Sequence, residues 1–317
     1  MSFNVVFLGT APFGFPVMRA LRREDRVSVQ GVITQPDRER GRGRETQSPP
    51  VADFARELDL PLYQPEDIND DGLDQCEPID FGIVIAYGQI LSSEVLEVPE
   101  RGFYNFHASL LPRWRGASPI RHALMAGDTK TGTTVFQVEE DLDTGPVCVR
   151  LETPVRSGET YGELYERLSQ INVGALNVLL SDLESGNISF RPQEGEVSYA
   201  PQIDSDEARI QWDQDAESIS NTIRAFCPDP GAYTFFQDDR IKIYEAVPYP
   251  GESSKATPGE IVQVDASEIH VAAGSGTVGV GEVQKAGSRR MDVEAFLAGH
   301  SDLDVGERFE SQKTATS

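Results

Sequence analysis

The chain has 317 residues, of which 38% are hydrophobic and 25% are charged, so it has room for a large core and about two domains. No apolar run approaches the roughly 20 residues that span a bilayer. The first residues lack the basic and apolar regions of a signal peptide, so we expect a cytoplasmic protein without a membrane segment. Three widely separated cysteines and the lack of metal-ligand spacing predict reduced thiols and no metal site.

The net charge is unusual. The chain carries 52 acidic and 28 basic side chains, a formal net charge of −24. Acidic surfaces stay hydrated and soluble in concentrated salt, so this charge predicts adaptation to a salty cytoplasm. Acidic faces also repel nucleic acid, which argues against an RNA substrate unless basic residues are placed locally.

The first half of the chain alternates strand-like and helix-like segments. Strands are predicted from apolar runs at residues 5–8, 27–33, 81–86 and 102–106. Helices are predicted at 15–21 and 50–58. This alternation is typical of an α/β domain with a Rossmann-like, mostly parallel sheet. In such sheets ligands bind beyond the carboxyl ends of the strands.

Two further segments of this half have clear signals. Residues 35–44 have Gly and Pro punctuation and no periodicity, which predicts a loop. Residues 157–183 predict a long helix, with Ser157 as the first candidate for its cap and Thr160 as the second.

The last third of the chain changes character. Residues 216–226 predict a short helix, and five short apolar segments between 233 and 283, separated by Gly, Asp and Ser, predict a small β-barrel. The expected organisation is therefore a catalytic domain, a linker, a barrel domain and a disordered tail. Their expected ranges are 1–188, 189–211, 212–310 and 311–317.

Asn105, His107 and Asp143 are the candidate catalytic residues. Side chains two positions apart on a strand project from the same face, so Asn105 and His107 are expected in one cleft, which Asp143 can close from a loop. Acyl transfer to an amine passes through an oxyanion, and one donor aimed at it is worth about 100- to 1,000-fold in rate. Asn and protonated His are such donors, and a carboxylate can accept the proton of the amine. Taken singly, each residue also has an ordinary structural explanation as a turn or core residue.

Several motifs carry a family resemblance along nearly the whole chain. They are Phe7–Thr10, Gln35–Arg38 with Gly41–Arg44, Ala86–Leu91, Asn105–Ile120, Gly127–Asp128, Thr131–Thr134, Leu142–Gly145, Tyr199–Ala200, Ala208–Trp212 and Arg224–Phe226. With these motifs the sequence resembles the folate-dependent formyltransferases. It is most similar to the branch that acts on methionyl-tRNA.

The resemblance implies a reaction and roles for particular residues. Asn105, His107 and Asp143 would be catalytic, and 10-formyltetrahydrofolate would give its formyl group to the α-amine of methionine on initiator methionyl-tRNA. The folate pocket would be lined by Tyr87, Gly88, Gln89, Ile90, Leu91, Ser109, Leu110, Leu111, Pro112, Val138 and Thr144. The tRNA would be bound by Arg38, Arg40, Arg42 and Arg44. The C-terminal barrel would be OB-like, and a monomer is expected.

Two other functions remain open. A formyltransferase for an amino sugar on a nucleotide shares the catalytic trio but lacks the arginine loop. A folate- or RNA-binding protein without turnover is disfavoured by the intact trio. Residues 206–309 hold 19 acidic and 9 basic side chains, so the tRNA assignment depends on local placement of the arginines.

Overall fold

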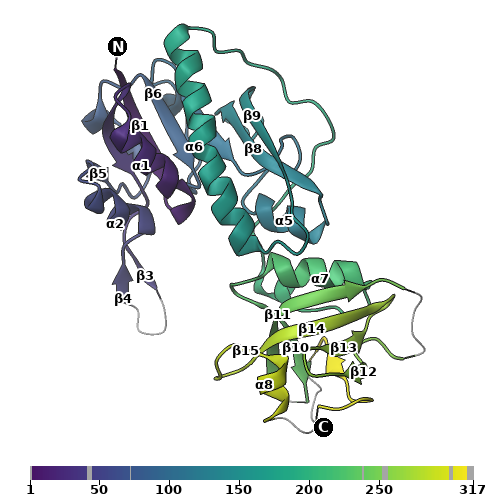
Figure 1. The fold of residues 1–317 in the computed structure, drawn as a ribbon. Coiled ribbons are helices and arrows are strands. Elements are labelled where there is room, and N and C mark those ends of the chain that lie inside the picture. Colours follow the sequence, from purple (N-terminus) through teal and green to yellow (C-terminus); the bar gives the residue numbers. More distant parts are fainter. Residues whose placement is uncertain are drawn as a thin grey trace. The chain divides into compact units, whose positions relative to one another are not determined.

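The computed structural model describes residues 2–40, 45–71, 73–237, 239–251, 256–299 and 303–312 (Figure 1). Contacts within the chain divide it into two compact units. Unit 1 comprises Met1–Pro119, Lys130–Pro154 and Tyr165–Pro201, and unit 2 comprises Ile120–Thr129, Val155–Leu164 and Gln202–Ser317. No helix in these described ranges is long and apolar enough to cross a membrane.

Unit 1 is built on a seven-stranded sheet with the order β5-β2-β1-β6-β7-β8-β9. Its strands are β1 (Phe3–Gly9), β2 (Val27–Ile33), β5 (Leu62–Tyr63), β6 (Phe81–Ile85), β7 (Phe103–His107), β8 (Lys130–Gln137) and β9 (Val147–Pro154). The pairings from β5 to β7 are parallel, and those of β8 with β7 and β9 are antiparallel. The expected mostly parallel α/β sheet is confirmed, and the antiparallel edge is new.

The helices that accompany this sheet follow the apolar spacing of the sequence. They are α1 (Phe15–Arg23), α2 (Pro50–Glu57), α3 (Ile68–Asp71), α4 (Ser93–Leu96) and most of α6 (Tyr161–Ser185), with short 3-10 turns at Pro12–Gly14 and Asp74–Cys76. The helix α5 (Pro119–Met125) falls in unit 2 from Ile120 onward. On α1 the buried side chains are Val17, Met18 and Leu21, which lie three and four positions apart, the spacing of one helical face.

The start of α6 corrects one prediction. Thr160 caps the helix, because its backbone N–H donates to Glu163 Oε2 at 2.9 Å and its hydroxyl accepts from Glu163 N at 3.4 Å. This reciprocal pair is a capping box, which satisfies backbone N–H groups that lack a helical partner. Ser157 lies before the cap, so the prediction of a helix from Ser157 was wrong by four residues.

The predicted loop at 35–44 contains the first strand of a hairpin. β3 (Arg38–Arg40) pairs antiparallel with β4 (Glu45–Gln47), and Arg38 lies opposite Gln47. The prediction of a loop over 38–40 was therefore wrong. The described side chains of these two strands, at 38–39 and 46–47, are polar and exposed, so the apolar alternation that would have revealed a strand is missing.

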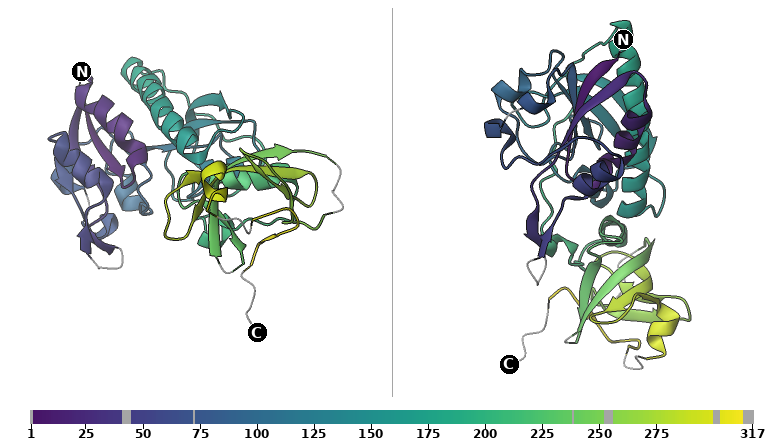
Figure 2. Two further views of the ribbon diagram at one scale, coloured as in Figure 1. Left: turned by 60° about the horizontal axis from the view of Figure 1, so that its bottom comes forward. Right: turned by 90° about the vertical axis from the view of Figure 1, so that its left-hand side faces the viewer.

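Unit 2 is a curled antiparallel sheet with the order β12-β13-β14-β11-β10-β16, and β15 pairs with β14 (Figure 2). Its strands are β10 (Ala232–Phe236), β11 (Asp239–Tyr249), β12 (Ile261–Val264), β13 (Ile269–Ala272), β14 (Thr277–Lys285), β15 (Met291–Asp292) and β16 (Phe309–Glu310). Its helices are α7 (Ala216–Ala225), α8 (Val293–Leu297) and a 3-10 turn at Ser205–Ala208.

The two ends of this sheet meet at one segment. Phe309 pairs with Phe236 on β10, and its backbone N–H also donates to Gly259 O at 2.8 Å, just before β12. The Trp212 ring packs on Phe309 and donates from Nε1 to Thr234 Oγ1 at 2.9 Å. The expected small barrel is confirmed as a curled sheet around these aromatic residues.

Candidate active site

β7 presents two polar side chains where its carboxyl end meets the loops. Tyr104 and Phe106 are each only 2% exposed, whereas Asn105 and His107 project from the other face. β7 lies between β6 and β8 in the sheet, so the backbone of Asn105 is fixed by pairing on both sides. The alternation of the strand thus delivers an amide and an imidazole to one place.

Asp143 meets both of these side chains. Asn105 Nδ2 donates to Asp143 Oδ1 at 3.4 Å, and His107 Nδ1 lies 3.6 Å from Asp143 Oδ2. His107 is 6% exposed and Asp143 is 8% exposed. The three residues that the sequence singled out therefore converge in one buried cluster, although Asp143 is 38 positions from Asn105.

A backbone carbonyl determines which nitrogen of His107 carries hydrogen. His107 Nε2 lies 2.8 Å from Trp114 O. Because a carbonyl oxygen only accepts, Nε2 must be the donor in this contact. Nδ1 then faces the Asp143 carboxylate, 3.6 Å from Oδ2.

The loop that carries Asp143 is tightly constrained. Asp143 has a φ of +53°, in the left-handed region that Asp tolerates better than most residues. Its Oδ2 accepts from Gly116 N at 2.7 Å. Any Cβ at Gly145 would lie 1.7 Å from Gln137 O, so only glycine fits where this loop crosses the sheet. The carboxylate is oriented by the backbone N–H of Gly116 at one oxygen and by the Asn105 side chain at the other.

The residues 87–91, predicted to line a folate pocket, divide into buried and exposed members. Tyr87 and Leu91 are 2% and 6% exposed and belong to the apolar core, and burial raises the pKa of Tyr87 well above its ordinary value. Gln89 accepts from Ile68 N and donates to Glu66 O. Gly88 has a φ of +86°, and Ile90 is 78% exposed. Of the side chains at 87–91, that of Ile90 is the most accessible to a ligand.

The second predicted folate segment, Ser109–Pro112, is held by hydrogen bonds to Thr134, which was not predicted as a site residue. Thr134 lies opposite His107 on β8, donates from Oγ1 to Ser109 O at 2.7 Å and accepts from Leu111 N at 3.1 Å. The Ser109 hydroxyl donates to Arg113 O at 2.6 Å. The remaining members, Leu110, Pro112, Val138 and Thr144, lie in the loops beside the trio, with Pro112 buried and the other three half-buried.

Of the predicted tRNA-binding arginines, Arg38 and Arg40 belong to β3. Arg38 is exposed. The side chain of Arg40, and Arg42 and Arg44 entirely, lie outside the described residues. The base of the hairpin is fixed by Gln64, whose Nε2 donates to Gln35 O at 3.1 Å and to Asp37 Oδ1 at 2.7 Å.

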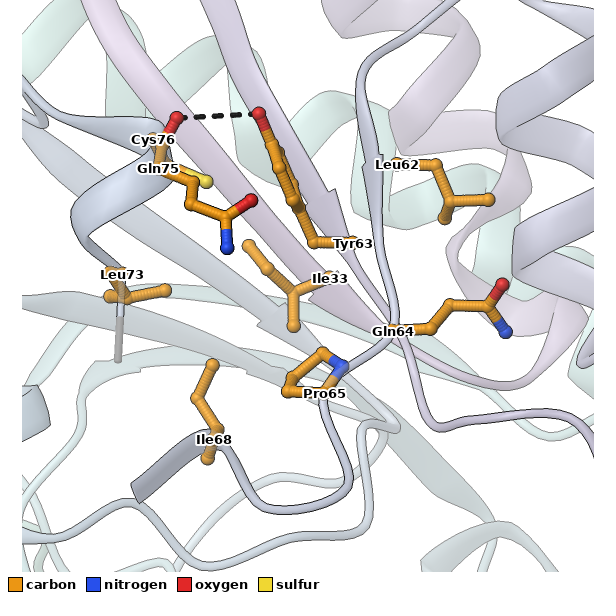
Figure 3. A pocket seen from close by; sticks show the side chains of 9 residues that line it. All are labelled: Ile33, Leu62, Tyr63, Gln64, Pro65, Ile68, Leu73, Gln75 and Cys76. Atoms are coloured by element: carbon orange, nitrogen blue, oxygen red, sulfur yellow. Dashed lines mark hydrogen bonds between the residues drawn. The ribbon is translucent and has the colours of Figure 1, made fainter. Parts of the chain in front are cut away.

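A cavity of about 390 Å³ lies beside this hairpin base (Figure 3). Its lining residues are Ile33, Leu62, Tyr63, Gln64, Pro65, Ile68, Leu73, Gln75 and Cys76, and Tyr63 Oη donates to Gln75 O at 3.3 Å. Neither the trio nor any predicted folate residue lines it. The cavity is thus separate from the cluster around Asp143.

Four further residues contact the cluster or the loops that hold it, and their role was not predicted from the sequence. They are Trp114, Gly116, Gln193 and Ser198. The first two stand in the motif that follows His107, which is the signal that points to them. Gln193 and Ser198 lie in the segment predicted to be a linker, where a polar composition conceals the contacts they make.

Comparison with known proteins identifies both parts of the chain. Residues 3–179 match the family described as formyl transferase, and residues 202–301 match the formyl transferase C-terminal domain. The methionyl-tRNA formyltransferase of Legionella pneumophila (strain Paris) is 40% identical over 308 residues, covering 96% of this chain and 98% of that protein. That of Symbiobacterium thermophilum is 40% identical over 311 residues, covering 96% and 95%.

Solved structures share the fold at lower identity. Methionyl-tRNA formyltransferase from Clostridium thermocellum has a TM-score of 0.53 and 18% identity, covering 77% of this chain and 93% of that one. HypX from Aquifex aeolicus, in complex with tetrahydrofolic acid, has a TM-score of 0.61 and 18% identity, covering 97% and 49%. An N-formyltransferase from Helicobacter canadensis has a TM-score of 0.65 and 14% identity, covering 91% and 100%.

Proposed function

Because the chain belongs to the formyl transferase family, we propose that Asn105, His107 and Asp143 carry out its reaction. The enzyme transfers the formyl group of 10-formyltetrahydrofolate to the amine of methionine on initiator methionyl-tRNA. The observation that carries the assignment of residues is the convergence of an amide, an imidazole and a carboxylate within 3.4 and 3.6 Å.

Each member of the trio has a chemical task. The amine nitrogen forms a bond to the formyl carbon, and the electron pair of the carbonyl moves to its oxygen. The Asn105 amide nitrogen carries two hydrogens, so one can bond Asp143 while the other donates to this oxyanion. Protonated His107 supplies positive charge beside the same oxygen. Asp143 accepts the proton that the amine loses, directly or through water.

The transfer ends when the oxyanion collapses. Its electron pair restores the carbonyl, and the bond to the folate nitrogen breaks. That nitrogen takes a proton, and we assign its transfer to protonated His107. Asp143 and His107 thus exchange protons across their 3.6 Å contact and return to their starting states.

We assign the folate to the face beside the trio where apolar side chains are exposed. Ile90 is 78% exposed and Leu142, next to Asp143, is 60% exposed. A flat pterin favours such apolar contacts, with backbone groups supplying its hydrogen bonds. Tyr87 and Leu91 act behind this surface as core residues that support the loop.

We assign the acceptor end of the tRNA to the arginine hairpin and the loop after His107. From Arg101 to Pro119 the chain carries three arginines and no acidic residue, although the whole chain has a net charge of −24. Arg113 is exposed, and its guanidinium lies 4.3 Å from the Trp114 ring centroid. Phosphate contacts by arginine dominate nucleic-acid affinity, so a local basic surface can outweigh a distant acidic one.

The assignment of residues is tested by formylation of initiator methionyl-tRNA with 10-formyltetrahydrofolate in low and molar KCl. His107→Ala and Asn105→Ala are each expected to lower kcat by about 100-fold or more, because each removes a donor to the oxyanion. Unchanged rates in both variants would remove these residues from the mechanism. A nucleotide-linked amino sugar assayed in parallel distinguishes the other acceptor class, and faster formylation of that sugar would overturn the tRNA assignment.

We also propose that the enzyme acts as a cytoplasmic monomer. Support comes from its translation-related relatives and from the acidic surface, since strong like charge on two copies opposes their association. Sedimentation equilibrium in 2 M KCl is expected to give the mass of one chain. A mass of two chains would contradict the monomer.

A further inference from the structure

We propose that Gln193 is a positioning residue that holds the Asp143 loop and, through Arg115, the segment that contacts His107. This inference rests on the roles proposed above for Asp143 and His107. Gln193 lies in a segment after α6 with the composition of a linker, and it touches none of the three catalytic side chains.

The backbone of this segment is pinned beside both loops of the site. Arg191 exchanges two hydrogen bonds with Val147, at the start of β9 and four residues after Asp143. Arg115 N donates to Ser198 O at 2.9 Å, and Ala200 N donates to Arg115 O at 2.7 Å. The segment therefore runs from the loop after Asp143 to the loop after His107, with Gln193 between its two fixed ends.

Gln193 uses its whole amide in bonds to the two loops. Its Nε2 donates to Asp143 O at 2.8 Å and to Gly145 O at 3.0 Å. Its Oε1 accepts from Arg115 Nη2 at 2.6 Å and from Arg115 Nε at 3.2 Å. An amide offers two donors and two acceptor lone pairs, so every one is satisfied. The side chain is half-buried, whereas its neighbours from Arg191 to Val197 are exposed.

The hydrogen bonds of Gln193 hold the Asp143 loop and the segment that contacts His107. Asp143 has a φ of +53°, a conformation that costs free energy and persists only when neighbours fix it. Gln193 fixes the carbonyl of that residue, while Gly116 N fixes its carboxylate at 2.7 Å. Arg115 follows Trp114, whose carbonyl accepts from His107 Nε2. Gln193 thus sets the relative position of the two loops that orient His107 and Asp143.

The test compares variants of the full-length enzyme in kcat, KM and the pH profile of kcat. Gln193→Met keeps the size of the side chain and removes all four bonds. Gln193→Glu keeps an acceptor for Arg115 but loses the donors to the Asp143 loop. Gln202→Met, at an exposed position of the same connecting segment, is the matched control. Each rate is measured per folded molecule, with folding checked by circular dichroism.

Gln193→Met and Gln193→Glu are expected to lower kcat by about 10- to 100-fold, because misplacement of a catalytic group by about 1 Å costs up to that much. KM for both substrates is expected to stay within about threefold, because the amide of Gln193 is used in its bonds to Asp143, Gly145 and Arg115. The pH profile of kcat is expected to shift, because the His107–Asp143 pair is displaced. The control stays near wild type. A merely structural glutamine would instead lower the melting temperature and leave kcat and the pH profile unchanged, and that result would overturn the inference.

A double variant separates this inference from the proposed role of Asp143. If Gln193 acts through Asp143, adding Gln193→Met to Asp143→Asn lowers the single-turnover rate by less than about threefold further. Multiplied losses would overturn the proposed action of Gln193 through the Asp143 loop. A fully active Asp143→Asn single variant would overturn the role of Asp143 itself. If Gln193→Met does not fold, Gln193→Glu carries the same comparison.

Discussion

At the scale of single residues, backbone groups orient the catalytic side chains. His107 Nε2 is held by the carbonyl of Trp114, and Asp143 Oδ2 by the N–H of Gly116. Both partners belong to one stretch of three residues. The conformation of that stretch therefore decides whether the imidazole and the carboxylate meet, and a change in it should affect catalysis without removing any reactive group.

Gly116→Ala is expected to destabilise the protein by about 1–3 kcal/mol and to lower kcat about tenfold or more. Gly116 has a φ of +115°, and a Cβ there would lie 2.8 Å from Ala200 O, so the backbone that donates to Asp143 Oδ2 must shift. Gly158→Ala is the control, since Gly158 also has a positive φ but open space around it. Urea unfolding and formylation rates measure both effects. Equal effects of the two substitutions would contradict the close-contact argument.

The three cysteines are expected to be unreactive in the folded protein. Burial raises the pKa of Cys76 to about 11 and that of Cys148 to about 12, and it also raises the pKa of Cys227. At pH 8 a pKa of 11 leaves about 0.1% of the thiol as reactive thiolate. Titration with Ellman's reagent at pH 8 should show no fast reaction in native protein and three thiols in denaturant. A fast native thiol would show that one of these sites is open to solvent.

The trio was predictable because each of its members stands in a short motif that can be read from neighbouring residues. Asn105 and His107 share a strand, and the motifs around them and Asp143 identify the chemistry. The residues that hold the trio were not predictable, because their bonds join distant positions. Gln193 lies 50 positions from Asp143 and 78 from Arg115, and nothing in its own neighbourhood suggests either contact.

At the scale of elements, apolar periodicity succeeded where an element buries one face. α1 follows its predicted range closely because its buried positions repeat at the spacing of a helix, and β2 does so because it is a short apolar run whose last three residues are buried. β8 and β9 were missed. β8 contains Thr131, Thr133 and Thr134, which are all buried, so several of its buried positions hold polar side chains. Thr133 bonds Asn172, and Thr134 bonds Ser109. Because hydrogen-bonded threonines occupy these buried positions, the strand lacks the apolar pattern from which strands are predicted.

Thr160→Ala is expected to destabilise the protein by about 1 kcal/mol, the usual cost of losing a helix cap. Ser157→Ala, before the cap and exposed, should change stability by less than about 0.5 kcal/mol. Urea unfolding at pH 7 in 2 M KCl measures both free energies. Equal losses in the two variants would return the helix start to Ser157.

The same cap predicts a dependence on pH. The hydrogen bond from the Thr160 backbone lowers the pKa of Glu163 below its ordinary value of 4.5. Because the pKa of Glu163 is lower in the folded state, its carboxylate contributes its full stabilisation above pH 4.5. This contribution is lost as the pH falls below the folded-state pKa. The difference between wild type and Glu163→Gln should therefore shrink as the pH falls below 4.5. A difference that grows in acid would contradict the bonded carboxylate.

At the scale of the whole molecule, charge opposes both folding and the binding of tRNA. A net charge of −24 repels itself within the compact state and repels phosphate. Salt reduces both effects, since the Debye length falls from about 10 Å at 0.1 M to about 3 Å at 1 M. Salt weakens the attraction between a phosphate and an arginine in contact with it less than it weakens the repulsion between that phosphate and distant acidic residues. We therefore expect the protein to be both folded and active in concentrated salt.

The melting temperature and the formylation rate are accordingly expected to rise together between 0.1 and 2 M KCl. A variant with Glu57, Glu97, Asp213 and Glu307 replaced by Lys provides the comparison, because all four side chains are exposed and the net charge changes from −24 to about −16. Its melting temperature should be higher than that of wild type at 0.1 M KCl and close to it at 2 M, where repulsion is screened. Calorimetry over the salt series measures the slopes. Parallel slopes for the two proteins would show that salt acts through hydration of apolar surface instead of through the acidic charge.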